Sequence, residues 1–96
     1  NARGFNFAVF SPTTGELKGS ACFDTFLHVG DVPKMNEYIN SIEDKDIVVY
    51  GIMDEGSRYL DDSAYATLET IGYPAGLKLN FRDSFVAIGI KGMTAT

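Results

Sequence analysis

Runs of apolar residues separated by short polar segments predict a chain that contains both strands and helices. Residues 5–10 are apolar at five of six positions, and residues 17–26 return after a turn that contains Pro and Gly. This pattern is typical of a β-hairpin. Residues 47–53 open with four consecutive strand-forming residues, as in a central strand that is buried on both faces. Residues 77–81 and 84–90 are two further strand candidates.

Apolar stripes at helical spacing predict a helix in each of the two intervening segments. In the first segment Met35, Ile39 and Ile42 form the stripe, and Asp31 is a good N-cap residue just before it. The acidic residues 43–46 that follow are interpreted as a solvated turn.

The second predicted helix begins at Asp61 or Asp62, either of which can cap it, and ends at Gly72. The resulting element order is ββ-α-β-α-ββ. This order predicts an α+β fold, a compact domain of two mainly antiparallel sheets with two helices.

Length and charge narrow the class of protein further. A chain of 96 residues makes one domain, residues 1–96, and its start at Asn1 suggests a piece excised from a larger protein. The net charge is −5 and the eight basic residues are scattered, so no nucleic-acid partner is expected. No apolar run approaches the roughly 18 residues of a membrane span, so no membrane insertion is expected.

The side chains that carry chemistry in many enzymes are scarce in this sequence. Cys22 is the one cysteine and His28 the one histidine. They lie six residues apart, with Cys22 inside the predicted strand 17–26 and His28 after it. A nucleophile and its base need to be in hydrogen-bond reach, so we interpret Cys22 as a buried thiol and His28 as a surface or packing residue. We therefore expect no catalytic residue, no metal and no cofactor.

Three polar residues stand where a core pattern would place apolar ones or at the ends of predicted strands. Asp54 follows the most apolar strand, Arg82 interrupts two apolar runs, and Arg3 precedes the first strand. Carboxylates accept hydrogen bonds from vicinal hydroxyls and guanidinium groups donate to ring or amide oxygens, so these residues could bind a neutral sugar. Tyr73 or Phe85 could stack on its apolar side. The alternative is that Asp54 and Arg82 form a structural salt bridge with each other.

Five motifs in this sequence resemble the interleukin-like EMT inducer domain, which is also called the GG domain. They occur in the family's order and span nearly the whole chain. The motifs are Arg3-Gly4, Phe23-Asp24-Thr25, Asp54-Glu55-Gly56-Ser57, Phe81-Arg82-Asp83-Ser84-Phe85 and Gly89-Ile90-Lys91-Gly92. The resemblance implies a compact α+β domain of two sheets with short helices.

The resemblance also implies a function without catalysis. The family includes secreted cytokine-like proteins, bacteriophage domains and the stem domain of protein O-mannose N-acetylglucosaminyltransferase, which is a lectin for β-linked N-acetylglucosamine. Its sugar contacts carry over to Asp54 and Arg82, and Arg3 is a third candidate. The lone Cys22 departs from the cytokine-like members, which have paired cysteines.

These observations predict a non-catalytic, lectin-like module that binds a glycan and targets its parent protein. Its partners would be the glycan and the other domains of that parent. The alternative function is a protein-interaction or assembly module, such as a receptor-binding domain on a bacteriophage tail or virion surface. An extracellular, luminal or virion-surface location would suit either function.

Overall fold

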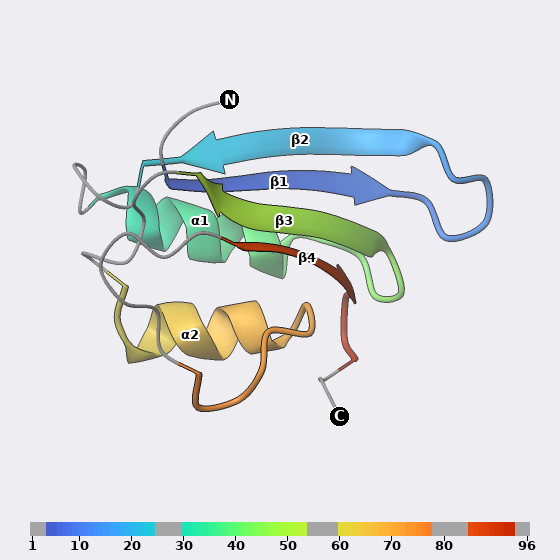
Figure 1. Cartoon of the computed structure of the whole chain (residues 1–96). Helices are drawn as coiled ribbons and strands as arrows, with labels where there is room; N and C mark the ends of the chain where they lie inside the picture. Colours follow the sequence, from blue (N-terminus) through green and yellow to red (C-terminus); the bar gives the residue numbers. More distant parts are fainter. Residues whose placement is uncertain (1–3, 25–29, 54–59, 78–84, 94–96) are drawn as a thin grey trace.

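The computed structural model describes residues 4–24, 30–53, 60–77 and 85–93, which form one sheet with helices on one side (Figure 1). The elements in chain order are β1 (Gly4–Phe10), β2 (Leu17–Phe23), α1 (Asp31–Asn40), β3 (Ile47–Met53), α2 (Asp62–Glu69) and β4 (Phe85–Ile90). The four strands are antiparallel in the order β2-β1-β3-β4. The predicted α+β class is confirmed.

The number of sheets differs from the expectation within the described residues. All four described strands join a single sheet, whereas two sheets were predicted. The additional strand was expected at residues 77–81. Leu77 lies in an exposed turn after α2, where its backbone N–H donates to the carbonyl of Pro74, and residues 78–81 lie outside the described part.

One face of the sheet and the two helices enclose an apolar core. Alternate side chains of the central strands point to this face, since successive residues of a strand lie on opposite sides. Phe7 is at its centre and packs on Tyr50 across the strand pair, with ring centroids 6.1 Å apart, and on Tyr38 of α1 at 5.8 Å. The other core side chains include Phe5, Val9, Val48 and Ile52 from the strands and Met35, Ile39, Ala64 and Leu68 from the helices.

The two helix starts are capped differently. Asp61, one of the two predicted candidates, is the N-cap of α2, and its carboxylate accepts a hydrogen bond of 2.8 Å from the backbone N–H of Ala64. The prediction that Asp31 caps α1 is wrong, because Gly30 occupies the N-cap position. The carboxylate of Asp31 instead accepts a hydrogen bond from the backbone N–H of Asp24, which holds the end of β2 against the start of α1.

The segment after α2 packs directly against β4. Gly72 ends the helix with a φ of +89°, a conformation in which glycine avoids the steric cost of a Cβ atom. Gly89 lies opposite it, so close that a Cβ atom there would be 1.7 Å from the carbonyl oxygen of Ile71. The contact is between two backbones, and no side-chain rearrangement can relieve such an overlap.

We therefore predict that Gly89→Ala destabilises the domain by roughly 3 kcal/mol or more, because β4 and the backbone at Ile71 and Gly72 must move apart. Urea denaturation followed by circular dichroism measures this loss. Gly30→Ala is the matched control, since a Cβ atom at Gly30 meets nothing within 4 Å, and it should change stability by about 0.5 kcal/mol or less. Equal stability of the two variants would contradict the backbone contact.

Candidate functional site

The three predicted sugar-binding residues, Arg3, Asp54 and Arg82, lie outside the residues that the structure describes. Their described neighbours can be located. Gly4 at the start of β1 pairs with Met53 at the end of β3, and Ile52 pairs with Phe85 at the start of β4. Arg3 directly precedes Gly4, Asp54 directly follows Met53, and Arg82 precedes Phe85 by three residues. The chain positions to which all three attach therefore lie at one end of the sheet, here called the Gly4–Met53 end.

The prediction that Tyr73 stacks on the sugar is wrong. Its side chain is 2% exposed and packs on Tyr65, with ring centroids 5.9 Å apart, so it belongs to the core. The side chain of Phe85 lies outside what the structure describes.

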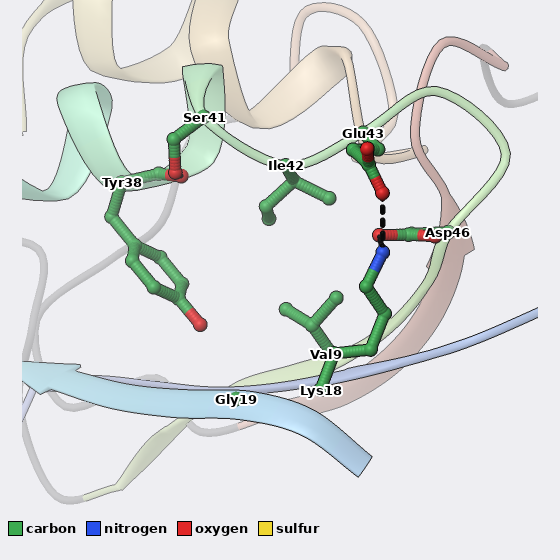
Figure 2. A pocket seen from close by; sticks show the side chains of 8 residues that line it. All are labelled: Val9, Lys18, Gly19, Tyr38, Ser41, Ile42, Glu43 and Asp46. Atoms are coloured by element: carbon green, nitrogen blue, oxygen red, sulfur yellow. Dashed lines mark hydrogen bonds and ion pairs between the residues drawn. The ribbon is translucent and has the colours of Figure 1, made fainter. Parts of the chain in front are cut away.

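A groove lies at the other end of the sheet, between β2 and the C-terminal end of α1 (Figure 2). Its volume is about 420 Å³. The lining includes Val9, Gly19 and Ile42, whose atoms are mainly apolar, and five residues with polar side chains. These polar residues are Lys18, Tyr38, Ser41, Glu43 and Asp46. We refer to this hollow as the Lys18 groove.

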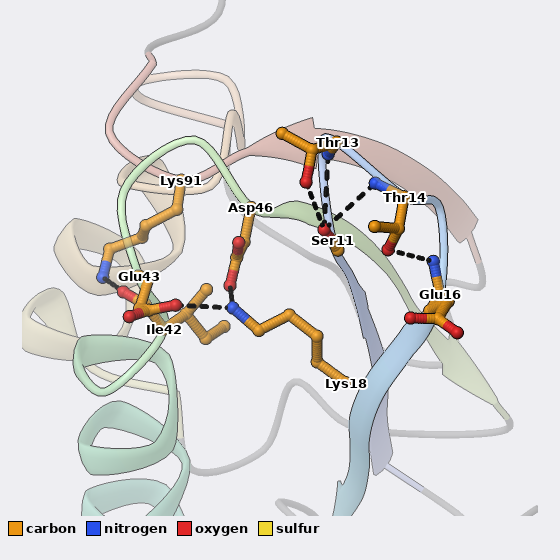
Figure 3. A network of polar contacts seen from close by, with 9 residues as sticks. All are labelled: Ser11, Thr13, Thr14, Glu16, Lys18, Ile42, Glu43, Asp46 and Lys91. Carbon is orange, nitrogen blue, oxygen red and sulfur yellow. Dashed lines mark hydrogen bonds and ion pairs between the residues drawn. The ribbon is translucent and has the colours of Figure 1, made fainter.

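Lys18 joins two acidic side chains on the wall of this groove. Its Nζ donates to Glu43 Oε1 and to Asp46 Oδ2, both at 2.6 Å (Figures 2 and 3). The hydrogen bonds to Asp46 and Glu43 raise the pKa of the Lys18 ammonium above its usual 10.5. The ion pairs fasten the edge strand β2 to the segment between α1 and β3.

The interpretation of residues 43–46 as a solvated turn is wrong for Asp46, which is 4% exposed. A buried carboxylate is costly unless it is paired, and Lys18 supplies the partner. Lys18 is the extra residue at the register shift between β1 and β2, where Val9 pairs with Gly19 and Phe10 with Leu17. Sequence reasoning had no signal for this pairing, because 28 residues separate the two side chains.

Lys91, the residue that follows β4, is only 9% exposed. Its Nζ donates to the carbonyl oxygens of Ile39 and Ile42, each at 2.9 Å. Figure 3 shows the hydrogen bond to Ile42. The carbonyl groups in the last turn of a helix have no partner within the helix, and a cation there also interacts favourably with the helix dipole. Lys91 therefore stabilises the end of α1, and its backbone pairs with Lys45 and Asp46.

The groove offers hydrogen-bonding groups but little free charge. The hydroxyl of Tyr38 points toward Gly19 of β2, and burial raises its pKa above the usual value. Glu43 and Asp46 are already bound to Lys18, which leaves them a mainly structural role. Within residues 4–24, 30–53, 60–77 and 85–93, no group of three or more metal-binding side chains is found.

The structure also revises the interpretation of Cys22. Its thiol is exposed on β2, on the side of the sheet away from the helices, where a buried thiol was expected. The alternation of side chains along β2 explains this position, because Ala21 and Phe23 occupy the face toward the core. His28 lies outside the described residues.

The structure is a small α+β domain with polar residues at the ends of its strands. Its described residues do not assemble a catalytic group. The sequence profile of the interleukin-like EMT inducer family matches residues 3–93. The chain belongs to this family.

Curated relatives agree with this assignment. The chain is 35% identical to human protein FAM3C over 91 residues and 32% identical to human protein FAM3B over 92 residues. It is also 32% identical over 90 residues to the human cell migration-inducing and hyaluronan-binding protein. These matches cover 95%, 96% and 94% of this chain but 39%, 39% and 7% of the relatives. No helix among the described residues has the length and apolar character needed to cross a membrane.

We predict that Lys18→Met lowers the melting temperature by several degrees at pH 7, because Asp46 stays buried without its partner. The pKa of Lys18 is raised in the folded state, so its stabilising effect is complete below pH 10.5 and is lost as the pH rises through the raised pKa. The difference between wild type and variant should therefore shrink above pH 10.5. Thermal unfolding at several pH values measures it.

The control for this experiment is Lys34→Met, which removes an exposed lysine from α1 and should leave the melting temperature nearly unchanged. Burial raises the pKa of Tyr50 to about 12, so its titration also destabilises the fold at high pH. That loss occurs equally in wild type and variants, and it cancels from the difference. A difference that is constant from pH 7 to pH 12 would show that the Lys18 ion pairs do not contribute.

Proposed function

We propose that this domain is a non-catalytic recognition module that binds a neutral glycan of the N-acetylglucosamine type at the Gly4–Met53 end of the sheet. Asp54 accepts hydrogen bonds from sugar hydroxyls, Arg82 donates to ring or amide oxygens, and Arg3 assists. The module targets its parent protein to that glycan.

The strand register is the observation that carries this proposal. Neighbouring Cα atoms are about 3.8 Å apart, so Arg3 and Asp54 are each one such step from the paired residues Gly4 and Met53. Arg82 is three residues from Phe85, a span of at most roughly 11 Å. Side chains attached within these distances of one sheet end can reach one small ligand.

The name of one relative favours a polysaccharide ligand, and the charge of the present chain favours a neutral one. The cell migration-inducing protein, of which this chain matches 7%, is hyaluronan-binding by name. The present chain has a net charge of −5, which disfavours a strongly anionic polymer. A single shallow site for a neutral sugar should bind with a dissociation constant near 1 mM, at about −4 kcal/mol.

We predict that titration with N-acetylglucosamine shifts amide NMR signals near Gly4, Met53 and Phe85 in the wild-type domain. Asp54→Ala and Arg82→Ala should each weaken binding at least tenfold, because each removes charge-assisted hydrogen bonds to the sugar. The matched controls are Asp62→Ala and Lys34→Ala, which remove exposed charges from the helices and should bind as the wild type does.

Two results would overturn the glycan site. One is the absence of any shift at 20 times the expected dissociation constant of about 1 mM. The other is a set of shifts confined to the Lys18 groove, around Tyr38 and Ser41, with unchanged binding by the Asp54 and Arg82 variants.

A second candidate function is a protein-interaction or assembly module, which would suit a cytokine-like extracellular domain or a virion-surface domain. The observation that favours it is the exposure of apolar side chains on β4, where Val86 is 78% and Ile88 73% exposed. A polar sugar site has no need of this surface.

A further inference from the structure

The strand β2 forms one edge of the sheet, and no described strand lies beyond it (Figure 1). An edge strand presents backbone N–H and C=O groups to any chain that can pair with them, so proteins usually block such edges with charged residues, prolines or bulges. β2 has two of these devices at its beginning, the charged Lys18 and the register shift between Val9 and Phe10. Residues 19–21, which follow, contain neither a charge nor a proline. Within the described structure, this part of the edge is accessible to a further strand.

The Lys18 groove lies beside this accessible part of the edge, on the side of the helices (Figure 2). Gly19 lines the groove, and of the described atoms a Cβ atom there would meet only the hydroxyl oxygen of Tyr38, at 3.9 Å. The other edge strand, β4, differs because the backbone of Ile71 fills the space beneath Gly89. The volume of about 420 Å³ is in the range of small ligand sites, so the groove can hold a side chain of a segment that pairs with β2.

The lining of the groove favours an apolar side chain. Val9 and Ile42 are aliphatic, and the ring of Tyr38 continues the aromatic cluster of the core. Several polar atoms of the lining already have partners within the domain, since Ser41 Oγ donates to the carbonyl of Tyr38 and Lys18 binds two carboxylates. Every second side chain of a strand that pairs with β2 points to the helix side of the sheet. An apolar residue at such a position would lie in the groove.

Charge indicates what kind of segment this edge attracts. A hollow of about 620 Å³ adjoins the groove at the beginning of β2, and its lining includes four acidic side chains and one lysine: Glu16, Glu43, Asp44, Asp46 and Lys18. The whole chain has a net charge of −5. Such a surface attracts a basic segment, and it repels an acidic one or a second copy of this chain.

We propose that β2 binds an extended, basic segment of a partner protein as an additional strand of the sheet. The backbone of that segment forms hydrogen bonds along residues 19–21, one apolar side chain enters the Lys18 groove, and flanking lysine or arginine side chains lie over the acidic hollow. Backbone pairing supplies affinity, and the groove and the charges supply specificity. This site is separate from the glycan site and from the exposed side chains of β4, so the inference depends on neither.

The short contact sets the expected strength of binding. A strand added along a few residues makes few hydrogen bonds, and a flexible peptide loses conformational freedom when it binds. We therefore expect a dissociation constant on the order of 100 μM. The attraction between exposed charges is screened by salt, so 500 mM NaCl should weaken binding about threefold or more relative to 50 mM NaCl.

NMR titration of the 96-residue chain with a blocked synthetic peptide, Lys-Val-Thr-Phe-Thr-Val-Lys, tests the proposal. We expect amide shifts at residues 19–21 and around Tyr38 and Ser41. A peptide with glutamate in place of both lysines should bind at least tenfold more weakly because the hollow is acidic. A peptide with every backbone nitrogen methylated should also bind at least tenfold more weakly, because it has no N–H group to donate to β2.

Variants of the chain test the groove and the charge separately. Gly19→Val fills the groove with atoms that meet only Tyr38, so it should stay folded by circular dichroism and bind the lysine peptide at least tenfold more weakly. The matched control is Gly30→Val, which adds the same side chain where a Cβ atom meets nothing within 4 Å and should bind as the wild type does. Glu16→Gln should weaken binding about threefold, and Asp62→Asn, an exposed acid on α2, should not.

Four results would overturn the proposal. They are the absence of any shift with 2 mM lysine peptide, equal binding of the lysine and glutamate peptides, unchanged binding by folded Gly19→Val, and shifts at residues 19–21 that follow the concentration of the chain alone. The last result would make a second copy the occupant of the edge. Titration of Gly19→Val with N-acetylglucosamine distinguishes this site from the glycan site, because loss of peptide binding should leave sugar binding unchanged.

Discussion

In the centre of the sheet β1 pairs with β3 from Gly4–Met53 to Phe10–Ile47, and every other feature of the domain depends on this register. Because side chains alternate along a strand, the pairing places Phe7 beside Tyr50 on the side that the helices cover. A shift of one residue between β1 and β3 would send one of the two aromatic rings to the opposite side of the sheet, so the apolar pattern specifies the register strongly. The same alternation sends Val49, Val86 and Ile88 to the side of the sheet away from the helices.

The two ends of the sheet have different physical characters. At one end Lys18 and Lys91 supply cations that satisfy Asp46 and the last carbonyl groups of α1. These contacts join β2, α1, β3 and β4, and they leave little of their hydrogen-bonding capacity for a ligand. The Gly4–Met53 end is where the proposed sugar contacts attach. A sheet that is fastened at one end is a rigid support for recognition by residues at the other end.

The proposed sugar site and the exposed apolar side chains of β4 lie on different parts of the sheet. A glycan site needs polar groups, whereas a protein interface needs an apolar patch. The proposed sugar contacts attach at the Gly4–Met53 end, and Val86 and Ile88 project from the side away from the helices. One small domain can therefore carry both kinds of surface.

Local patterns in the sequence determined the α+β class, the bounds of β3, the N-cap Asp61 and the helix stop at Gly72, since each of these depends on neighbouring residues. The five sequence motifs indicated to which family the chain belongs. Tertiary structure decided that Asp46 is buried against Lys18, that Tyr73 belongs to the core and that Cys22 is exposed. It also decided that the apolar residues of β4 face outward. Burial and pairing across long stretches of chain depend on which elements meet in space, and the local order of residues does not contain that information.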